Sequence, residues 1–195
     1  MLSKKNTAAE KASKFCNGSS VKETNEKVLN LARTSVDGFV RVSEGMIAQM
    51  VIKLYSMGII SEPSGALGLA GLTKMKQLIK GKNVAVILTG ANIDLTQLNQ
   101  ARDMNLISKG YKNCYLIELP NKKNVVYELI TNCFKETDII TIQYSKKSTK
   151  ETSQALISVE SLSQEDVEES IEKLRDGKFT FEIINEKEQL LDLFF

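Results

Sequence analysis

The chain has 195 residues, of which 42% are hydrophobic and 26% are charged, a composition typical of a globular protein with a buried core. A formal net charge of +2 is too small to predict nucleic acid or a membrane surface as a partner. The chain has no histidine, and its three cysteines form no CxxC pair, so we predict neither a metal site nor a histidine base. No apolar stretch is long enough to cross a membrane. The sparse cysteines fit a reducing compartment, and we expect a cytoplasmic protein.

The first half of the chain predicts helices that alternate with short strands. The clearest helix covers residues 44–57, because apolar side chains recur there at helical spacing, with Ser43 as the N-cap and Gly58 at the end. Residues 83–88 form a continuous apolar run, which is typical of a strand covered on both faces in a parallel sheet. The other predicted elements are helices at 24–33, 66–80 and 95–107 and a strand at 39–42.

Three glycines follow one another at every third position, one directly before the predicted helix at 66–80 and two within it. Gly65, Gly68 and Gly71 each cost about 1 kcal/mol relative to alanine in a helix interior. This cost indicates that the helix backbone closely approaches something else. Two interpretations remain open, tight packing against a sheet or proximity to a ligand.

The second half predicts a different pattern, with the order βαββαβ. This order is typical of a ferredoxin-like sandwich, with a polar hairpin turn at 146–151 between the central strands. By fold alone such a unit could bind a metabolite, RNA or another protein. The aromatic-rich strand of RNA-binding versions is absent, because residues 113–119 hold one tyrosine and the acidic Glu118, which favours a small-molecule regulatory module. The predicted strands are 113–119, 139–144, 153–159 and 179–184, and the predicted helices are 124–134 and 164–174.

Five short motifs follow one another in a specific order. They are Lys14-Phe15-Cys16-Asn17-Gly18-Ser19-Ser20-Val21, Phe39-Val40-Arg41-Val42-Ser43-Glu44-Gly45, Glu62-Pro63-Ser64-Gly65-Ala66-Leu67, Gly81-Lys82 and Leu88-Thr89-Gly90-Ala91-Asn92. Together they resemble the second half of the catalytic domain of biosynthetic threonine dehydratases, and the βαββαβ tail resembles the ACT-like regulatory domain of that family. The resemblance implies an α/β chain in two parts. Residues 1–109 would be part of a three-layer domain of the pyridoxal-phosphate fold type II (tryptophan synthase beta-like), and residues 110–195 an ACT-like domain.

The resemblance implies pyridoxal 5'-phosphate as the cofactor and assigns five residues to its site. Thr89 takes the place of the family's serine, whose hydroxyl faces the pyridine nitrogen, and Glu62 matches an acidic residue near the ring. Asn17 and Gly18 match a turn close to the cofactor face, and Gly90 shapes the turn after Thr89. Each has a structural alternative: a strand end for Thr89, a carboxylate favoured by the helix dipole for Glu62, and ordinary turns for the rest.

Two elements of the family are absent from the sequence. The cofactor lysine of the family lies in a Ser-Phe-Lys-x-Arg-Gly motif, which does not occur here, and no two of the eleven glycines are adjacent to form the phosphate-binding loop. We therefore assign no catalytic residue and predict that this chain alone is inactive. We expect a truncated gene product, one half of a split gene, or an incomplete gene model.

The tail also departs from the family at its first loop. The family's Pro-x-x-Pro-Gly is replaced by Pro120-Asn121-Lys122-Lys123-Asn124. The family's effectors are isoleucine and valine, and Val125 and Val126 are candidates for contacting them, with core packing as the alternative. The resemblance implies L-threonine as substrate and a homo-oligomer or an association with a full-length homologue. The alternative is a non-catalytic module that binds an amino acid or associates with another subunit.

Overall fold

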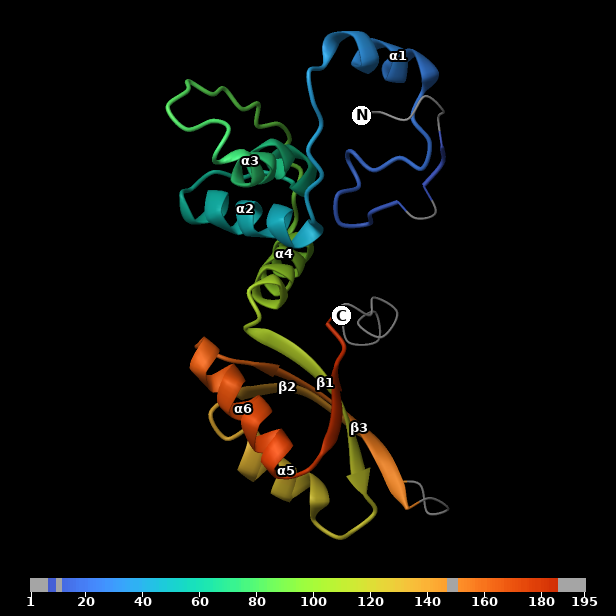
Figure 1. Ribbon diagram of the computed structural model, residues 1–195, viewed down its shortest axis with the longest axis vertical. Coiled ribbons are helices and arrows are strands. Elements are labelled where there is room, and N and C mark those ends of the chain that lie inside the picture. Colours follow the sequence, from blue (N-terminus) through green and yellow to red (C-terminus); the bar gives the residue numbers. More distant parts are fainter. Residues whose placement is uncertain (1–6, 10–11, 147–150, 186–195) are drawn as a thin grey trace. The chain divides into compact units, whose positions relative to one another are not determined.

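The computed structural model describes residues 7–9, 12–146 and 151–185 of the chain (Figure 1). The chain divides into two compact units, Met1–Asn105 and Leu106–Phe195. In the part of the chain that the structure describes, no helix is both long and apolar enough to cross a membrane.

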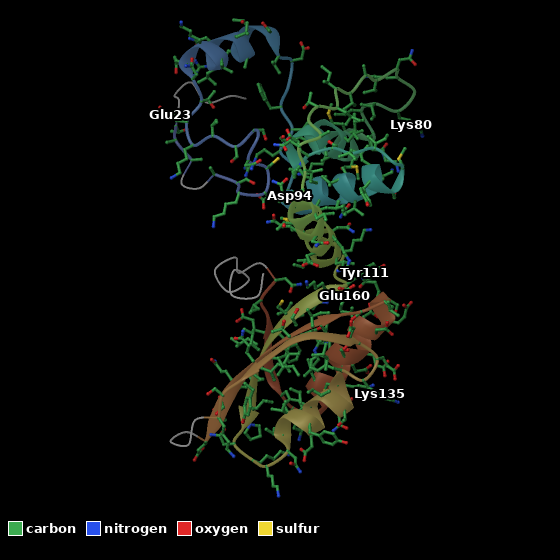
Figure 2. All side chains as sticks on the ribbon, turned by 180° about the vertical axis from the view of Figure 1, so that it is seen from behind. Glu23, Lys80, Asp94, Tyr111, Lys135 and Glu160 are labelled. Atoms are coloured by element: carbon green, nitrogen blue, oxygen red, sulfur yellow. The ribbon has the colours of Figure 1, made fainter. Side chains whose placement is uncertain are left out.

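Four helices begin in the described residues of the first unit. They are α1 (Glu26–Ser35), α2 (Glu44–Ser56), α3 (Pro63–Met75) and α4 (Leu95–Ser108). The predicted ends of α2 are confirmed: the Ser43 hydroxyl accepts a hydrogen bond from the Met46 N–H, and Gly58 follows with a φ of 75°. In Figure 2, Lys80 lies on the loop after α3, and Asp94 stands directly before α4, where its carboxylate accepts from the Gln97 N–H at 2.7 Å.

The core of the first unit lies around α2 and α3, which pack side by side (Figure 1). The segment that contains Phe15 and Cys16 packs into the same core, although it lies far from α3 in sequence. The buried members are Phe15, Cys16, Ile47, Ala48, Val51, Leu54, Ala66, Ala70 and Ala101. This core therefore positions the motif around Gly18 against the start of α3.

The two predicted strands of the first unit are wrong. Residues 39–42 and 83–88 are not in regular strands, and Phe39 and Ile87 are 58% and 81% exposed. A strand forms only where its N–H and C=O groups pair with a neighbouring strand, and the described residues of this unit contain none. The three-layer arrangement predicted for residues 1–109 is consequently not present in the described residues.

The second unit contains a four-stranded antiparallel sheet in the order β2-β3-β1-β4. Its elements are β1 (Lys112–Pro120), α5 (Val125–Cys133), β2 (Asp138–Tyr144), β3 (Thr152–Glu160), α6 (Gln164–Asp176) and β4 (Thr180–Ile183). The predicted βαββαβ order is confirmed, and α5 and α6 cover one face of the sheet (Figure 1). Residues 147–150 of the predicted hairpin turn lie outside the described residues.

The core of this unit is built around Tyr115. Its ring lies 5.4 Å from the ring of Phe134 and 6.2 Å from that of Phe181, in tilted arrangements that aromatic pairs prefer. The hydroxyl of Tyr115 is buried with no hydrogen-bond partner among the described residues. Burial, with a smaller contribution from the charge of Cys114, raises the pKa of Tyr115 to about 12.

One side chain closes the end of the sheet after β4. The Asn185 amide oxygen accepts from the Cys114 N–H at 2.8 Å, and its nitrogen donates to the Lys112 carbonyl at 3.2 Å and to Asn113 Oδ1 at 2.9 Å. The amide thus continues the β1–β4 pairing beyond the last backbone pair. Tyr111 and Glu160 mark the same end of the sheet in Figure 2, where the Ser161 N–H donates to the Tyr111 carbonyl at 2.8 Å.

Candidate functional site

The start of α3 is tied to the turn that follows Thr89. Pro63 occupies the first turn of the helix, where its missing N–H costs nothing, and Glu62 precedes it with extended backbone. The Glu62 N–H donates to the Gly90 carbonyl at 3.0 Å. This bond joins two motifs that are separated by 28 positions in the chain.

Gly90 lies directly against the Glu62 side chain. A Cβ at Gly90 would stand 2.3 Å from Glu62 Oε1 and 2.4 Å from Glu62 Cδ, closer than real Cβ contacts allow. The φ of Gly90 is 68°, in the left-handed region that favours glycine. Both the space and the backbone conformation therefore require glycine here.

Gly18 approaches the same carboxylate from a third segment. A Cβ at Gly18 would stand 3.3 Å from Glu62 Oε1 and 2.6 Å from Ser64 Oγ, and the Ser64 hydroxyl donates to Glu62 Oε1 at 2.6 Å. The neighbouring Asn17 is exposed, and its carbonyl accepts from the Ser20 N–H at 3.4 Å. The structure thus brings Gly18, Glu62 and Gly90 together around one carboxylate.

Thr89 is exposed, and its backbone packs against α3. A Cβ at Gly65 would stand 1.6 Å from the Thr89 carbonyl oxygen, and a Cβ at Gly68 would stand 2.9 Å from Val86 Cγ1. Of the two interpretations of the glycine ridge, close packing is the one observed for these two positions, although the partner is an extended segment and not a sheet. A Cβ at Gly71 would meet no described atom within 4 Å.

Sequence reasoning did not assign Ser64 to the site. The Ser64 hydroxyl donates a hydrogen bond to the Glu62 carboxylate, and the same hydroxyl lies next to Gly18. A serine two positions after an acidic residue at a helix start is a weak signal, because such serines usually cap backbone groups.

A second carboxylate anchors the segment before Gly18. The Ser13 hydroxyl donates to Glu44, in the first turn of α2, and accepts from the Cys16 N–H at 2.9 Å. Burial raises the pKa of the Cys16 thiol, a hydrogen bond from Ser19 opposes the rise, and the charges of Glu44 and Glu62 add to it. Cys16 therefore stays a protonated thiol at neutral pH and is a poor nucleophile.

The described residues contain no group of three or more acidic, cysteine or histidine side chains that could hold a metal ion. The candidate site of the first unit contains the Glu62 carboxylate, the Ser64 hydroxyl and the closely approaching backbone of Gly18 and Gly90.

The second unit has a hollow at the end of β1 away from Asn185. Charged groups of both signs line it beside the ring of Phe179, and the Thr152 hydroxyl donates to Glu118 at 2.6 Å. Its lining residues are Glu118, Pro120, Lys122, Thr152, Gly177, Lys178, Phe179 and Thr180. Of the two predicted effector contacts, Val125 is buried in the core and Val126 packs against that core, so their role in effector binding stays a prediction.

Comparison with known proteins shows which family the first unit is similar to. Residues 2–90 match the model of the pyridoxal-phosphate dependent enzymes, a segment that contains Gly18, Glu62, Ser64, Thr89 and Gly90. These residues make the first unit similar to the pyridoxal-phosphate dependent enzymes. Pyridoxal phosphate, the cofactor predicted from the resemblance, is the cofactor on which the matched family depends.

The chain is similar to enzymes named biosynthetic L-threonine dehydratase IlvA. It is 32% identical to that of Halalkalibacterium halodurans over 186 residues, which are 94% of this chain and 45% of the relative. It is 30% identical to that of Bacillus subtilis over 186 residues, 94% of this chain and 44% of the relative. The threonine dehydratase resemblance is thereby confirmed, and the chain spans less than half the length of these relatives.

Proposed function

We propose that this chain contributes one wall of the cofactor site of a threonine dehydratase, an enzyme that converts L-threonine to 2-oxobutanoate and ammonia. The observation that carries the proposal is the convergence of Gly18, Glu62 and Gly90, from three distant segments, around one carboxylate. Two of the three have no side chain, and any Cβ there would collide with Glu62 or Ser64. The bare backbone of Gly18 and Gly90 leaves the space that the Glu62 carboxylate and the Ser64 hydroxyl occupy, and it thereby fixes the position of the carboxylate.

The residues of this wall have chemistry that suits pyridoxal 5'-phosphate. When bound, the cofactor supplies an electron sink that stabilises negative charge on the substrate carbon. Thr89 would direct its hydroxyl to the pyridine nitrogen, which a neutral hydroxyl does not hold protonated as a carboxylate would. Glu62, held by Ser64 and by the Gly90 backbone, would orient the ring from its edge.

Residues 1–109 in this proposal are part of the cofactor domain, and residues 110–195 are an ACT-like regulatory domain. The chain alone would be inactive, because the sequence has neither the Ser-Phe-Lys-x-Arg-Gly motif nor adjacent glycines. The active enzyme would bind L-threonine and would be a homo-oligomer or an assembly with a full-length homologue.

A hydroxyl-specific variant pair tests the role of Thr89. The chain is co-expressed with the part of the H. halodurans dehydratase that the chain does not match, and 2-oxobutanoate formation is measured. Thr89→Val, which keeps the shape and removes the hydroxyl, is expected to lower kcat by at least about tenfold, whereas Thr89→Ser retains most of it. Equal activity of the two variants would contradict the role.

Inactivity of the chain alone is tested by covalent trapping. The chain is mixed with pyridoxal 5'-phosphate, reduced with borohydride and digested for mass spectrometry. We expect no single lysine to carry the cofactor in stoichiometric amount. A stoichiometric adduct at one lysine would contradict the proposed inactivity.

A second candidate function, binding of a free amino acid, is favoured by the hollow of the second unit. Glu118 offers a carboxylate for an α-ammonium group, Lys178 an ammonium for an α-carboxylate, and Phe179 an apolar surface for the side chain. Isoleucine or valine would fit this combination. Calorimetry with isoleucine is expected to give binding that Lys178→Gly weakens and Lys123→Gln leaves unchanged. Glycine keeps the backbone of Lys178, whose φ is 55°, free of strain. A titration without heat would remove this candidate.

A further inference from the structure

Asn17 and Gly18 form the one Asn-Gly pair in the sequence. Such a pair is chemically reactive, because the backbone nitrogen of the second residue can attack the side-chain amide carbon of the asparagine. Glycine has no side chain to obstruct this approach. Every other asparagine of the sequence is followed by a residue that carries a Cβ. The sequence therefore favours this reaction at Asn17 more than at any other position.

The fold leaves both reacting groups accessible. Asn17 and Gly18 are exposed in the turn that follows the buried Cys16. Among the described residues, neither the Asn17 side chain nor the Gly18 N–H makes a hydrogen bond. The hydrogen bonds of the turn use other groups, since the Ser19 N–H donates to the Cys16 carbonyl at 3.1 Å and the Ser20 N–H to the Asn17 carbonyl at 3.4 Å. The Gly18 nitrogen can consequently attack without first losing a hydrogen bond of its own.

The packing at the start of α3 requires the glycine that makes Asn17 reactive. A Cβ at position 18 would stand 2.6 Å from Ser64 Oγ and 3.3 Å from Glu62 Oε1. A side chain that would shield the Gly18 nitrogen therefore collides with the Ser64 hydroxyl. The reactivity of Asn17 is thus a direct consequence of the close approach of this turn to the Glu62 carboxylate.

We infer that Asn17 is a site of spontaneous modification, at which the folded chain forms a succinimide with Gly18 and then isoaspartate or aspartate. In the first step the Gly18 nitrogen bonds to Asn17 Cγ and the Cγ–Nδ2 bond breaks. The side-chain nitrogen leaves as ammonia with the proton of the Gly18 N–H. Water then opens the ring: cleavage at Cγ gives aspartate, and cleavage at the main-chain carbonyl carbon gives isoaspartate. The inference goes beyond the proposed function and does not depend on the cofactor.

The isoaspartate product changes the main chain next to the candidate site. Its main chain runs through Cβ and Cγ of residue 17, so the connection between Cys16 and Gly18 becomes longer by one atom. Cys16 is anchored in the core of the first unit, and Gly18 lies against Ser64. The longer turn cannot keep both contacts unchanged. We therefore expect the modification to loosen the packing of Cys16.

The first test compares the folded chain with the chain unfolded in urea. Both are incubated in mildly alkaline buffer, loss of ammonia is followed by peptide mass spectrometry, and isoaspartate is identified by enzymatic methylation. In the folded chain, Asn17 is expected to react at least about tenfold faster than Asn92. Asn92 is the internal control, because it is also exposed but is followed by the β-branched Ile93, whose N–H donates to the Ala91 carbonyl at 2.9 Å.

The second test uses the Asn17→Gln variant as the matched control. Glutamine keeps an amide at this exposed position, but its longer side chain must close a larger ring and reacts more slowly. The natural chain and the variant are aged together and then treated with a thiol-alkylating reagent. Alkylation of Cys16 is expected to become severalfold faster in the aged natural chain only, and its thermal midpoint should fall. Alkylation of Cys133, which is buried in the second unit, should stay unchanged in both.

Two outcomes overturn the modification site. An Asn17 amide that persists in the folded chain and is lost in urea would show that the fold protects it. Equal rates at Asn17 and Asn92 would show that the accessible Gly18 nitrogen has no influence. The structural consequence can fail separately: isoaspartate that forms without any change in Cys16 alkylation or in the thermal midpoint contradicts the loosening of the turn.

Discussion

At the scale of single residues, the buried hydroxyl of Tyr115 is a costly group. It lies in the core of the second unit with no hydrogen-bond partner among the described residues. An unsatisfied buried polar group costs about 1–3 kcal/mol. Tyr115→Phe is therefore expected to raise the free energy of unfolding of this unit by about 1 kcal/mol in urea denaturation. Tyr127→Phe, at a position that is 70% exposed on α5, is the control and should change nothing measurable. A destabilised Tyr115→Phe variant would contradict the absence of a partner.

The same residue predicts a dependence of stability on alkaline pH. Its pKa is raised to about 12 in the folded chain from the usual value near 10, so the folded state favours the neutral phenol. This contribution is complete below about pH 10 and is lost as the pH rises toward 12. Urea midpoints measured from pH 8 to 11 should fall more steeply for the natural chain than for Tyr115→Phe. Parallel slopes would contradict the raised pKa.

The candidate site could be predicted only partly from single residues. Glu62, Gly18 and Gly90 stand in recognisable motifs, and the structure places them together, while their role toward the cofactor stays a prediction. Ser64 was missed because a serine hydroxyl has many possible acceptors, and its choice of Glu62 depends on the fold of the turn. Long-range approaches such as that of Gly18 to Ser64 are not encoded in local spacing.

At the scale of elements, replacing two glycines of the same helix, α3, by alanine is expected to change the stability of the first unit in opposite directions. Gly65→Ala would place a Cβ 1.6 Å from the Thr89 carbonyl oxygen, and it should destabilise the first unit by several kcal/mol, on the order of severe overpacking. Gly71→Ala would meet no described atom within 4 Å and should stabilise by up to about 1 kcal/mol through helix propensity. Thermal unfolding followed by circular dichroism compares them. Equal effects would show that residues 86–89 do not pack on α3.

Helices and paired strands were predictable, whereas isolated strands were not. Helix α2 carries its information locally, because its hydrogen bonds, its Ser43 cap and its apolar spacing lie within one segment. The strands of the second unit were also predicted, since their partners lie in the same unit. Residues 83–88 have the composition of a strand but lack a described neighbour to pair with, and composition cannot supply one.

At the scale of the whole molecule, the three buried cysteines report on the two units separately. Cys16 lies in the first unit, and Cys114 and Cys133 lie in the second. Burial raises the pKa of Cys16 and of Cys133, although Lys173 opposes the rise at Cys133, so alkylation at neutral pH should be slow in the folded chain.

With increasing urea, we expect Cys16 to be alkylated at a lower concentration than Cys114 and Cys133. The second unit is held by long-range strand pairing around a closed core, whereas the described first unit has no strand ladder and exposes many apolar side chains. Pulsed alkylation followed by peptide mass spectrometry gives the order. Simultaneous modification of all three would indicate one cooperative unit, and the reverse order would contradict the comparison.

The amide of Asn185 has a consequence over time. Asparagine side chains slowly hydrolyse to aspartate, and here the reaction would replace a group that both donates and accepts by one that only accepts. The new carboxylate would face the Lys112 carbonyl oxygen and Asn113 Oδ1. Both of these oxygens accept hydrogen bonds from the Asn185 amide in the present structure. Hydrolysis of this one side chain would thus replace two hydrogen bonds by repulsion between oxygen atoms, and the end of β4 would separate from β1.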